Sequence, residues 1–283
     1  IIDDSSNLNF LIPSLKVFES HNYLVWNEIK RFIHCFQNLE ELTIDDATYD
    51  VYEDEAEEYY VDYQDILKFP KLKKLSCDTF SSTFGEYSKS MVELSELKEL
   101  EEINWLSLDY DTELTKFKSL KKIDTLVVRE VNSITLLMDI MKNIEVKSIN
   151  LWQVNDDPNN YKLFSNIKDT ATRFYISSGN INEVSDFSFL SGLNNLEEID
   201  IGSNVDGDWS EPVDISSLNN LKKLNTIKIP IYYDEDTIDN KFALSGFSSL
   251  KKLEINNMFY DLDNLKKLPM LESLEITHPK NLN

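Results

Sequence analysis

The chain has 283 residues, of which 41% are hydrophobic and 28% charged, a composition typical of a folded globular protein. Its formal charge of −23 disfavours direct binding to nucleic-acid phosphates and favours a protein partner that carries a basic patch. Six glycines leave little material for phosphate-binding loops, and two cysteines are too few for a disulfide-stapled secreted domain.

The hydropathy of the chain and its first residues predict its relation to membranes and to a longer polypeptide. No apolar run reaches the roughly 18 residues that a membrane span needs, so we expect no contact with a membrane. The sequence begins Ile1-Ile2-Asp3-Asp4, without an initiator methionine or a basic leader. We therefore expect a single domain, 1–283, that belongs to a longer polypeptide. The low number of cysteines favours a reducing compartment, the cytoplasm or the nucleus.

One short pattern recurs along the chain: an apolar residue, two variable residues, an apolar residue, one variable residue and an apolar residue. Segments 196–201, 250–255 and 271–276 show it clearly. We place its first position at Ile12, Leu39, Leu72, Ile103, Ile123, Val146, Ala171, Leu196, Leu224, Leu250 and Leu271. Consecutive repeats start about 26 residues apart on average, and the pattern resembles the leucine-rich repeat, whose length is roughly 20 to 29 residues.

The resemblance implies an α/β solenoid of about eleven repeats, a horseshoe with a parallel concave β-sheet and helices on the convex side. Helical periodicity between the expected strands, at 133–141 and 161–167, agrees with this arrangement. A large apolar residue also stands three places before many of the expected strand leucines, and we expect it to pack between neighbouring repeats. These residues are Phe36, Phe69, Phe117, Leu193, Phe247 and Leu268.

The early part of the chain carries an acidic, tyrosine-rich insertion at 45–65. It contains ten carboxylates and five tyrosines and no basic residue. Alternating acids and tyrosines are able to hold a Lys/Arg-rich partner by charge and by cation–π contact. The alternative is a solvated loop that runs into a helix near 60–67. The residues of this secondary acidic patch are Asp54, Glu55, Glu57 and Glu58.

The middle of the array is the main candidate for a binding site. Residues between the inward apolar positions of each strand point to the concave face. On four consecutive repeats this face combines aromatic and arginine residues, the types that dominate binding hot spots. We predict the partner-binding centre at Trp105, Tyr110, Arg129, Trp152, Arg173 and Tyr175.

Alternatives to this site remain open at the level of sequence. A register shift of one residue would turn either tryptophan inward, and each arginine is equally compatible with an ordinary solvated position. The same register also places Val127, Ser148, Glu198, Asp200 and Lys228 on the exposed face.

The irregular repeats also resemble those of fungal F-box receptors, the substrate-recognition subunits of cullin-type ubiquitin ligases. This resemblance implies a non-catalytic module that forms the substrate-binding or adaptor part of a larger assembly. The alternative is a structural scaffold subunit held permanently in a multiprotein complex. Because no spacing of His, Cys or Ser matches a hydrolase or zinc motif, we expect no enzymatic activity, cofactor or metal.

Overall fold

The protein is described from a computed structural model of the full chain. The structure describes residues 12, 14–20, 30–44, 63–77, 94–109, 117–129, 143–152, 170–178, 187–201, 216–230, 246–256 and 262–277. The chain divides into two compact units, each treated by itself. Unit 1 comprises Ile1–Ser107 and Thr112–Ile123, and unit 2 comprises Leu108–Asp111 and Asp124–Asn283.

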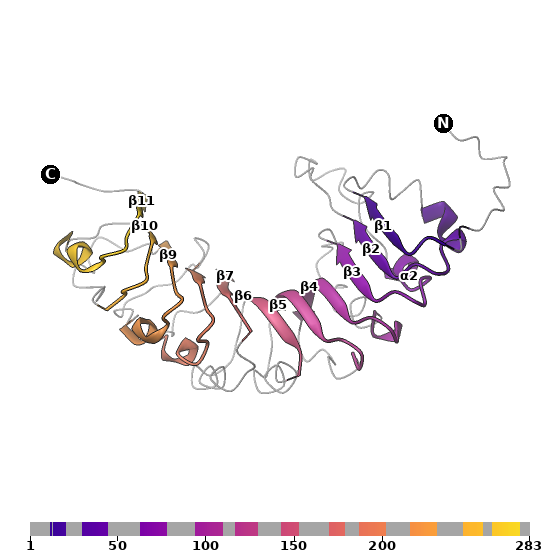
Figure 1. The fold of residues 1–283 in the computed structure, drawn as a ribbon, viewed down its shortest axis with the longest axis horizontal. Coiled ribbons are helices and arrows are strands. Elements are labelled where there is room, and N and C mark those ends of the chain that lie inside the picture. The colour runs from indigo at the N-terminus through magenta and orange to yellow at the C-terminus, as the bar shows by residue number, and fades with distance from the viewer. Residues whose placement is uncertain are drawn as a thin grey trace. The chain divides into compact units, whose positions relative to one another are not determined.

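The described residues form eleven strands that follow one another in chain order (Figure 1). The strands are β1 (Val17–Ser20), β2 (Glu41–Ile44), β3 (Lys74–Cys77), β4 (Glu102–Asp109), β5 (Lys122–Arg129), β6 (Glu145–Trp152), β7 (Arg173–Ser178), β8 (Glu198–Ile201), β9 (Thr226–Pro230), β10 (Lys252–Asn256) and β11 (Ser273–Thr277). Pairing is parallel from β1 to β4 in unit 1 and from β6 to β11 in unit 2. This confirms the predicted solenoid of parallel strands.

The described connections between strands are short helices. They are the 3-10 helices η1 (Lys30–Cys35), η3 (Leu94–Glu96), η6 (Ser188–Leu190), η7 (Ser216–Asn220) and η8 (Leu262–Lys267), and the α-helix α2 (Tyr63–Ile66). The end of the acidic insertion therefore enters a helix, as one of its two interpretations anticipated. The helices expected at 133–141 and 161–167 lie outside the described residues.

The core is a set of apolar rows that cross the strands in register. In unit 2, Ile149 is opposite Phe174, which is opposite Ile199, and the row continues through Ile227 and Leu253. All five are buried. Because no single repeat can enclose such a side chain alone, each strand depends on its neighbours for burial.

Three repeat positions were predicted in the wrong frame. Phe18 pairs with Leu42, so the repeat predicted at Ile12 starts at Leu15. Ile103 pairs with Leu75, which places the start of that repeat at Leu100.

The third correction concerns β5. The amides of Lys121 and Lys122 both donate to the carbonyl of Glu101, just as those of Glu101 and Glu102 donate to Lys73. Lys121 therefore corresponds to Glu101, and the repeat predicted at Ile123 starts at Leu120.

The turn before each strand has the predicted packing role. The amide of Leu39 donates to the carbonyl of Phe36 at 3.0 Å, and that of Leu72 donates to Phe69 at 3.1 Å. This turn brings the residue three places before the leucine under the sheet. All six turn residues are buried: Phe36, Phe69, Phe117, Leu193, Phe247 and Leu268.

Gly246 occupies a backbone conformation that disfavours other residues. Its φ is 102°, and a Cβ added there would lie 2.8 Å from Nδ2 of Asn219. We expect Gly246→Ala to lower the free energy of unfolding by about 1 to 2 kcal/mol. Urea denaturation checks this result against Ser248→Ala, an exposed control two residues away. Equal stability of both variants would contradict the assigned backbone geometry.

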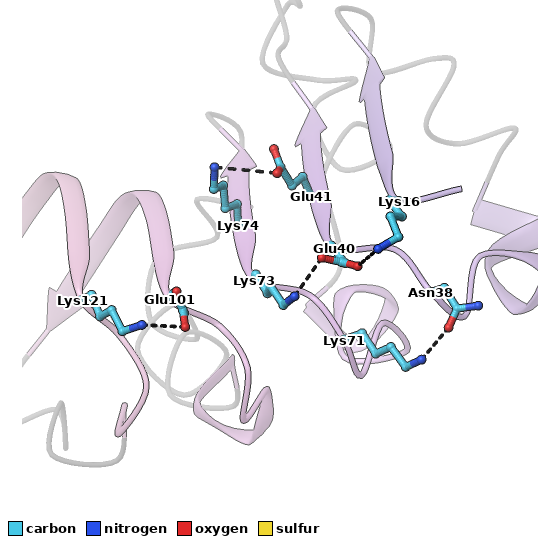
Figure 2. Close-up of polar contacts among 9 residues, drawn as sticks. All are labelled: Lys16, Asn38, Glu40, Glu41, Lys71, Lys73, Lys74, Glu101 and Lys121. Carbon is cyan, nitrogen blue, oxygen red and sulfur yellow. Dashed lines mark hydrogen bonds and ion pairs between the residues drawn. The ribbon is translucent and has the colours of Figure 1, made fainter. Parts of the chain in front are cut away.

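A ladder of alternating charges, the strand-start ladder, precedes the strands of unit 1 (Figure 2). Glu40 lies between Lys16, at 2.5 Å, and Lys73, at 2.8 Å, and Glu101 pairs with Lys121 at 2.6 Å. In unit 2 the same position holds Lys251 and Glu272, whose charged atoms are 3.2 Å apart. Since each pair joins consecutive repeats, the ladder favours the observed register over its alternatives.

The ladder predicts a specific pH dependence. Hydrogen bonds from Lys16 and Lys73 lower the pKa of Glu40 from 4.5 to about 2. Because the folded pKa lies below the unfolded one, the ionised carboxylate stabilises the fold above about pH 4.5. That contribution disappears as the pH falls from about 4.5 to about 2.

We expect Glu40→Gln to be less stable than the natural chain at neutral pH, and we expect the difference to vanish by about pH 2. Urea midpoints measured across this pH range test the expectation, with Glu96→Gln on η3 as the exposed control. A stability difference that does not change with pH would show that Glu40 acts through something other than its charge.

Candidate functional site

The predicted site residues are described to different extents. Arg173 is exposed and Tyr175 half-buried on β7 of unit 2, and Trp105 is half-buried on β4 of unit 1. Arg129 and Trp152 lie in β5 and β6, but their side chains fall outside the described residues, as does the whole of Tyr110. The secondary patch, Asp54, Glu55, Glu57 and Glu58, also lies outside them.

Two side chains that were predicted to be exposed are buried. Val127 is buried, and so is its neighbour Leu126, so β5 does not follow the simple alternation that its predicted frame assumed. Ser148 is on the predicted face, opposite Arg173, but is only 2% exposed. Its hydroxyl has no hydrogen-bond partner among the described residues. Correct register therefore did not guarantee exposure.

The exposed face of unit 2 brings five side chains together on three adjacent strands, and we call them the β7–β9 cluster. The cross-strand register places the polar residues of each strand opposite those of the next strand. Arg173 on β7 is opposite Glu198 on β8, while Tyr175 is opposite Asp200, which in turn is opposite Lys228 on β9. Parallel pairing thus holds the five side chains at fixed strand spacings.

Lys228 is the centre of the charges in the β7–β9 cluster. Its Nζ lies 2.9 Å from Oε1 of Glu198 and 3.0 Å from Oδ2 of Asp200. The three side chains are each about one quarter exposed: 25% for Lys228, 24% for Glu198 and 23% for Asp200. We expect this interaction to be stronger than that of a typical surface ion pair, because one cation pairs with two partly buried carboxylates.

The surroundings fix the protonation states in the cluster. Partial burial disfavours the charged Lys228, but its hydrogen bonds to Glu198 and Asp200 outweigh this effect and hold its pKa above the ordinary value. Burial also raises the pKa of Tyr175, and the nearby charge of Glu198 adds to it, while a hydrogen bond with Arg173 opposes it. At neutral pH, Lys228 is therefore charged and the Tyr175 phenol is neutral.

The cluster is formally neutral within a very acidic chain. Its two cations, Arg173 and Lys228, balance its two carboxylates, Glu198 and Asp200, whereas the whole chain carries −23. Arg173 offers a guanidinium and Tyr175 an aromatic ring with a hydroxyl, so the surface combines directed hydrogen bonding with apolar area. The cluster therefore adds no net charge of its own to the strongly negative surface of the chain.

Sequence reasoning placed Glu198, Asp200 and Lys228 on the exposed face but left them out of the predicted site. The available signal was the opposite charge at equivalent positions of consecutive repeats, Asp200 and Lys228, which cross-strand pairing brings together.

Among the residues that the structure describes, no three His, Cys, Asp or Glu side chains are grouped so as to hold a metal ion. In the same part of the chain, no helix has the length and apolar character to cross a membrane.

Solved structures similar to this chain include a leucine-rich-repeat protein from Leptospira interrogans. It aligns with 89% of this chain and 63% of its own, with 13% sequence identity and a TM-score of 0.43. This chain thus spans less than two thirds of that protein's length. No protein-family model matches the sequence, and no curated protein matches it. The parallel strands and inward apolar rows of the present chain are consistent with a leucine-rich-repeat solenoid.

Proposed function

We propose that this protein is a non-catalytic recognition module that binds a protein partner through the β7–β9 cluster. The observation that carries the proposal is the ion-paired, formally neutral cluster on an otherwise strongly acidic chain. Arginine and tyrosine at such a position are the residue types enriched in binding hot spots. The surrounding negative charge favours a partner whose rim is basic.

The partner-binding centre predicted from the sequence is larger than the cluster. Tyr110, Arg129 and Trp152 remain proposed contributors together with Arg173 and Tyr175. Trp105, which lies in unit 1, remains a candidate contact of its own, and the acidic patch near Asp54 remains a proposed secondary contact for basic residues. Trp152 rests on the repeat pattern and on residue type, and the acidic patch rests on its composition. Trp105, Tyr110 and Arg129 rest on residue type alone, because strand pairing moves the repeats that placed them to Leu100 and Leu120.

The narrower proposal is a substrate receptor or adaptor in a ubiquitin ligase of the F-box type, in the cytoplasm or nucleus. Its support is the resemblance of the irregular repeats to those of fungal F-box receptors. The alternative is a scaffold subunit held permanently in a complex. Co-purification of the natural full-length protein with a cullin-bound adaptor would favour the receptor, whereas a fixed set of subunits without cullin would favour the scaffold.

Affinity capture followed by mass spectrometry tests recognition by the cluster. The natural chain is compared with a variant that carries Arg173→Ala and Tyr175→Ala, after circular dichroism has shown that both fold. We expect the variant to lose a specific partner by roughly tenfold or more, as two hot-spot truncations imply. Glu275→Ala, at an exposed position on β11, is the matched control. An unchanged partner list for the double variant would reject the cluster as the binding site.

A further inference from the structure

Arg173 is the cation of the β7–β9 cluster that has no carboxylate partner among the described residues. It is exposed on β7, and within the part of the chain that the structure describes it forms no ion pair. Its hydrogen-bond partner there is Tyr175, two residues further along the same strand. On a chain with 51 acidic and 28 basic residues, an arginine without a carboxylate calls for a local explanation.

The carboxylate opposite Arg173 is turned toward β9. Glu198 is opposite Arg173 in the parallel register of β7 and β8, and paired strands lie about 4.8 Å apart. On its other side Glu198 is opposite Thr226, yet its Oε1 lies 2.9 Å from Nζ of Lys228, two residues beyond Thr226. Glu198 therefore pairs with a diagonal cation and not with the one directly opposite.

Lys228 holds Glu198 because it belongs to a network of three charges. Its Nζ also lies 3.0 Å from Oδ2 of Asp200, so both carboxylates converge on one cation. Each of the three side chains is about one quarter exposed, and charges attract one another more strongly where there is less solvent. Both carboxylates of the cluster are thus paired without Arg173.

The residue type of Arg173 indicates what it binds. The ion pairs of the strand-start ladder and of the cluster all use lysine, and arginine occurs in this chain only at Arg31, Arg129 and Arg173. A guanidinium, unlike an ammonium, holds a carboxylate or a phosphate by two parallel hydrogen bonds. Because Glu198 and Asp200 lie on the adjacent strand, a singly charged carboxylate is favoured over a doubly charged phosphate.

We propose that Lys228 is a positioning residue, which holds Glu198 and so leaves the Arg173 guanidinium open to an Asp or Glu carboxylate of the protein partner. This inference rests on the proposed binding through the β7–β9 cluster. The partner then presents an acidic residue at the centre of the contact, within the basic rim that the charge of the chain favours. Tyr175 supports the contact through its hydrogen bond with Arg173.

Arginine modification tests the positioning role without a partner. Phenylglyoxal reacts with a neutral guanidinium, so a carboxylate that pairs with Arg173 slows the reaction, which peptide mass spectrometry follows. We expect Lys228→Met to slow it by about threefold or more, because Glu198 then turns to Arg173. Adding Glu198→Gln restores the rate. Lys252→Met makes the same change in net charge on β10 and serves as the control, with no change in rate.

The same variants connect the positioning role to recognition. The probe is the purified protein that the natural chain captures and that the variant with Arg173→Ala and Tyr175→Ala loses. We expect Lys228→Met to weaken its binding by about threefold or more, as competition from Glu198 implies, and Glu198→Gln to restore it. Arg173→Lys also weakens binding, because a lysine lacks the planar donors. Phosphatase treatment of the probe leaves its affinity unchanged. Circular dichroism confirms that each variant is folded.

Failure of this inference is distinguishable from failure of the proposed function. Capture that does not depend on Arg173 and Tyr175 overturns both. Capture that depends on them, with no effect of Lys228→Met on the modification rate or on binding, overturns the positioning role alone. A loss of binding that Glu198→Gln does not restore also overturns it, because Lys228 then contacts the partner itself. Sensitivity of the probe to phosphatase overturns the assignment of a carboxylate.

Discussion

Phe174→Ala is expected to lower the free energy of unfolding by about 3 to 5 kcal/mol, the usual cost of removing a buried phenylalanine side chain. Phe174 is fully buried and lies between Ile149 on β6 and Ile199 on β8. In a solenoid the resulting cavity weakens both neighbouring repeats, so the loss spreads through β6 and β8. Urea denaturation followed by circular dichroism measures the loss.

Glu275→Ala on β11 is the control for Phe174→Ala, and we expect it to change stability by no more than about 0.5 kcal/mol. Glu275 is exposed and is opposite Glu254 in the sheet. A loss below about 1 kcal/mol for Phe174→Ala would mean that β7 does not present this residue to the core, since truncation of a buried phenylalanine costs several times more.

Lys228→Met has the second-largest expected effect, a loss of about 1 to 3 kcal/mol at neutral pH. The methionine keeps the apolar stem and removes the cation that Glu198 and Asp200 share at 2.9 and 3.0 Å. Two partly buried carboxylates are then left close together without the cation that they share. The loss would be larger if the cluster were fully buried. Each of the three side chains is about one quarter exposed, so solvent screens the remaining charges and reduces the loss.

Two further variants separate charge from packing at Lys228. Adding Glu198→Gln to Lys228→Met removes one of the unpaired charges, and we expect it to recover part of the lost stability. Lys252→Met is the control, because Lys252 is 40% exposed and lies 3.8 Å from Glu254, a pair expected to contribute less than about 1 kcal/mol. If Lys228→Met and Lys252→Met lowered the free energy of unfolding by the same small amount, the charges of the cluster would not contribute to the stability of the fold.

The parallel solenoid was predictable because its inward positions recur with little variation. Leu39 and Leu72 in unit 1, and Ala171 and Leu196 in unit 2, start their repeats where the pattern placed them. Such positions are constrained by burial between neighbouring strands, so the same residue types return in each repeat.

Two of the three frames that failed lie in runs with the same apolar spacing. In Leu100, Ile103 and Leu106, three apolar residues stand at intervals of three, so the repeat pattern fits equally well from the first or from the second. The run Leu120, Ile123 and Leu126 has the same spacing, but Thr125 takes the last apolar position of the pattern read from Leu120, so here the pattern favours the wrong frame. Only the pairing with the preceding strand selects the frame, and pairing depends on how each intervening segment closes, which local periodicity does not encode.

The candidate site was predicted only in part for a related reason. Residue type pointed to Arg173 and Tyr175, but the role of Lys228 depends on which residues face it across β8 and β9. Ser148 shows the converse, because its face was predicted correctly but its side chain is only 2% exposed, which the repeat pattern does not indicate. A binding hot spot is formed by residues from several strands. The pattern of a single repeat therefore identifies candidate residues but not which of them lie together.

Oxidative footprinting of Tyr175 in the presence and absence of a captured partner tests recognition through the β7–β9 cluster most directly. Met270, which is 49% exposed on the turn before β11, serves as the internal reference within the same molecule. We predict that the partner protects Tyr175 from oxidation and leaves Met270 unchanged. Protection of Met270 with no change at Tyr175 would contradict the account and would place the bound partner at the β11 end.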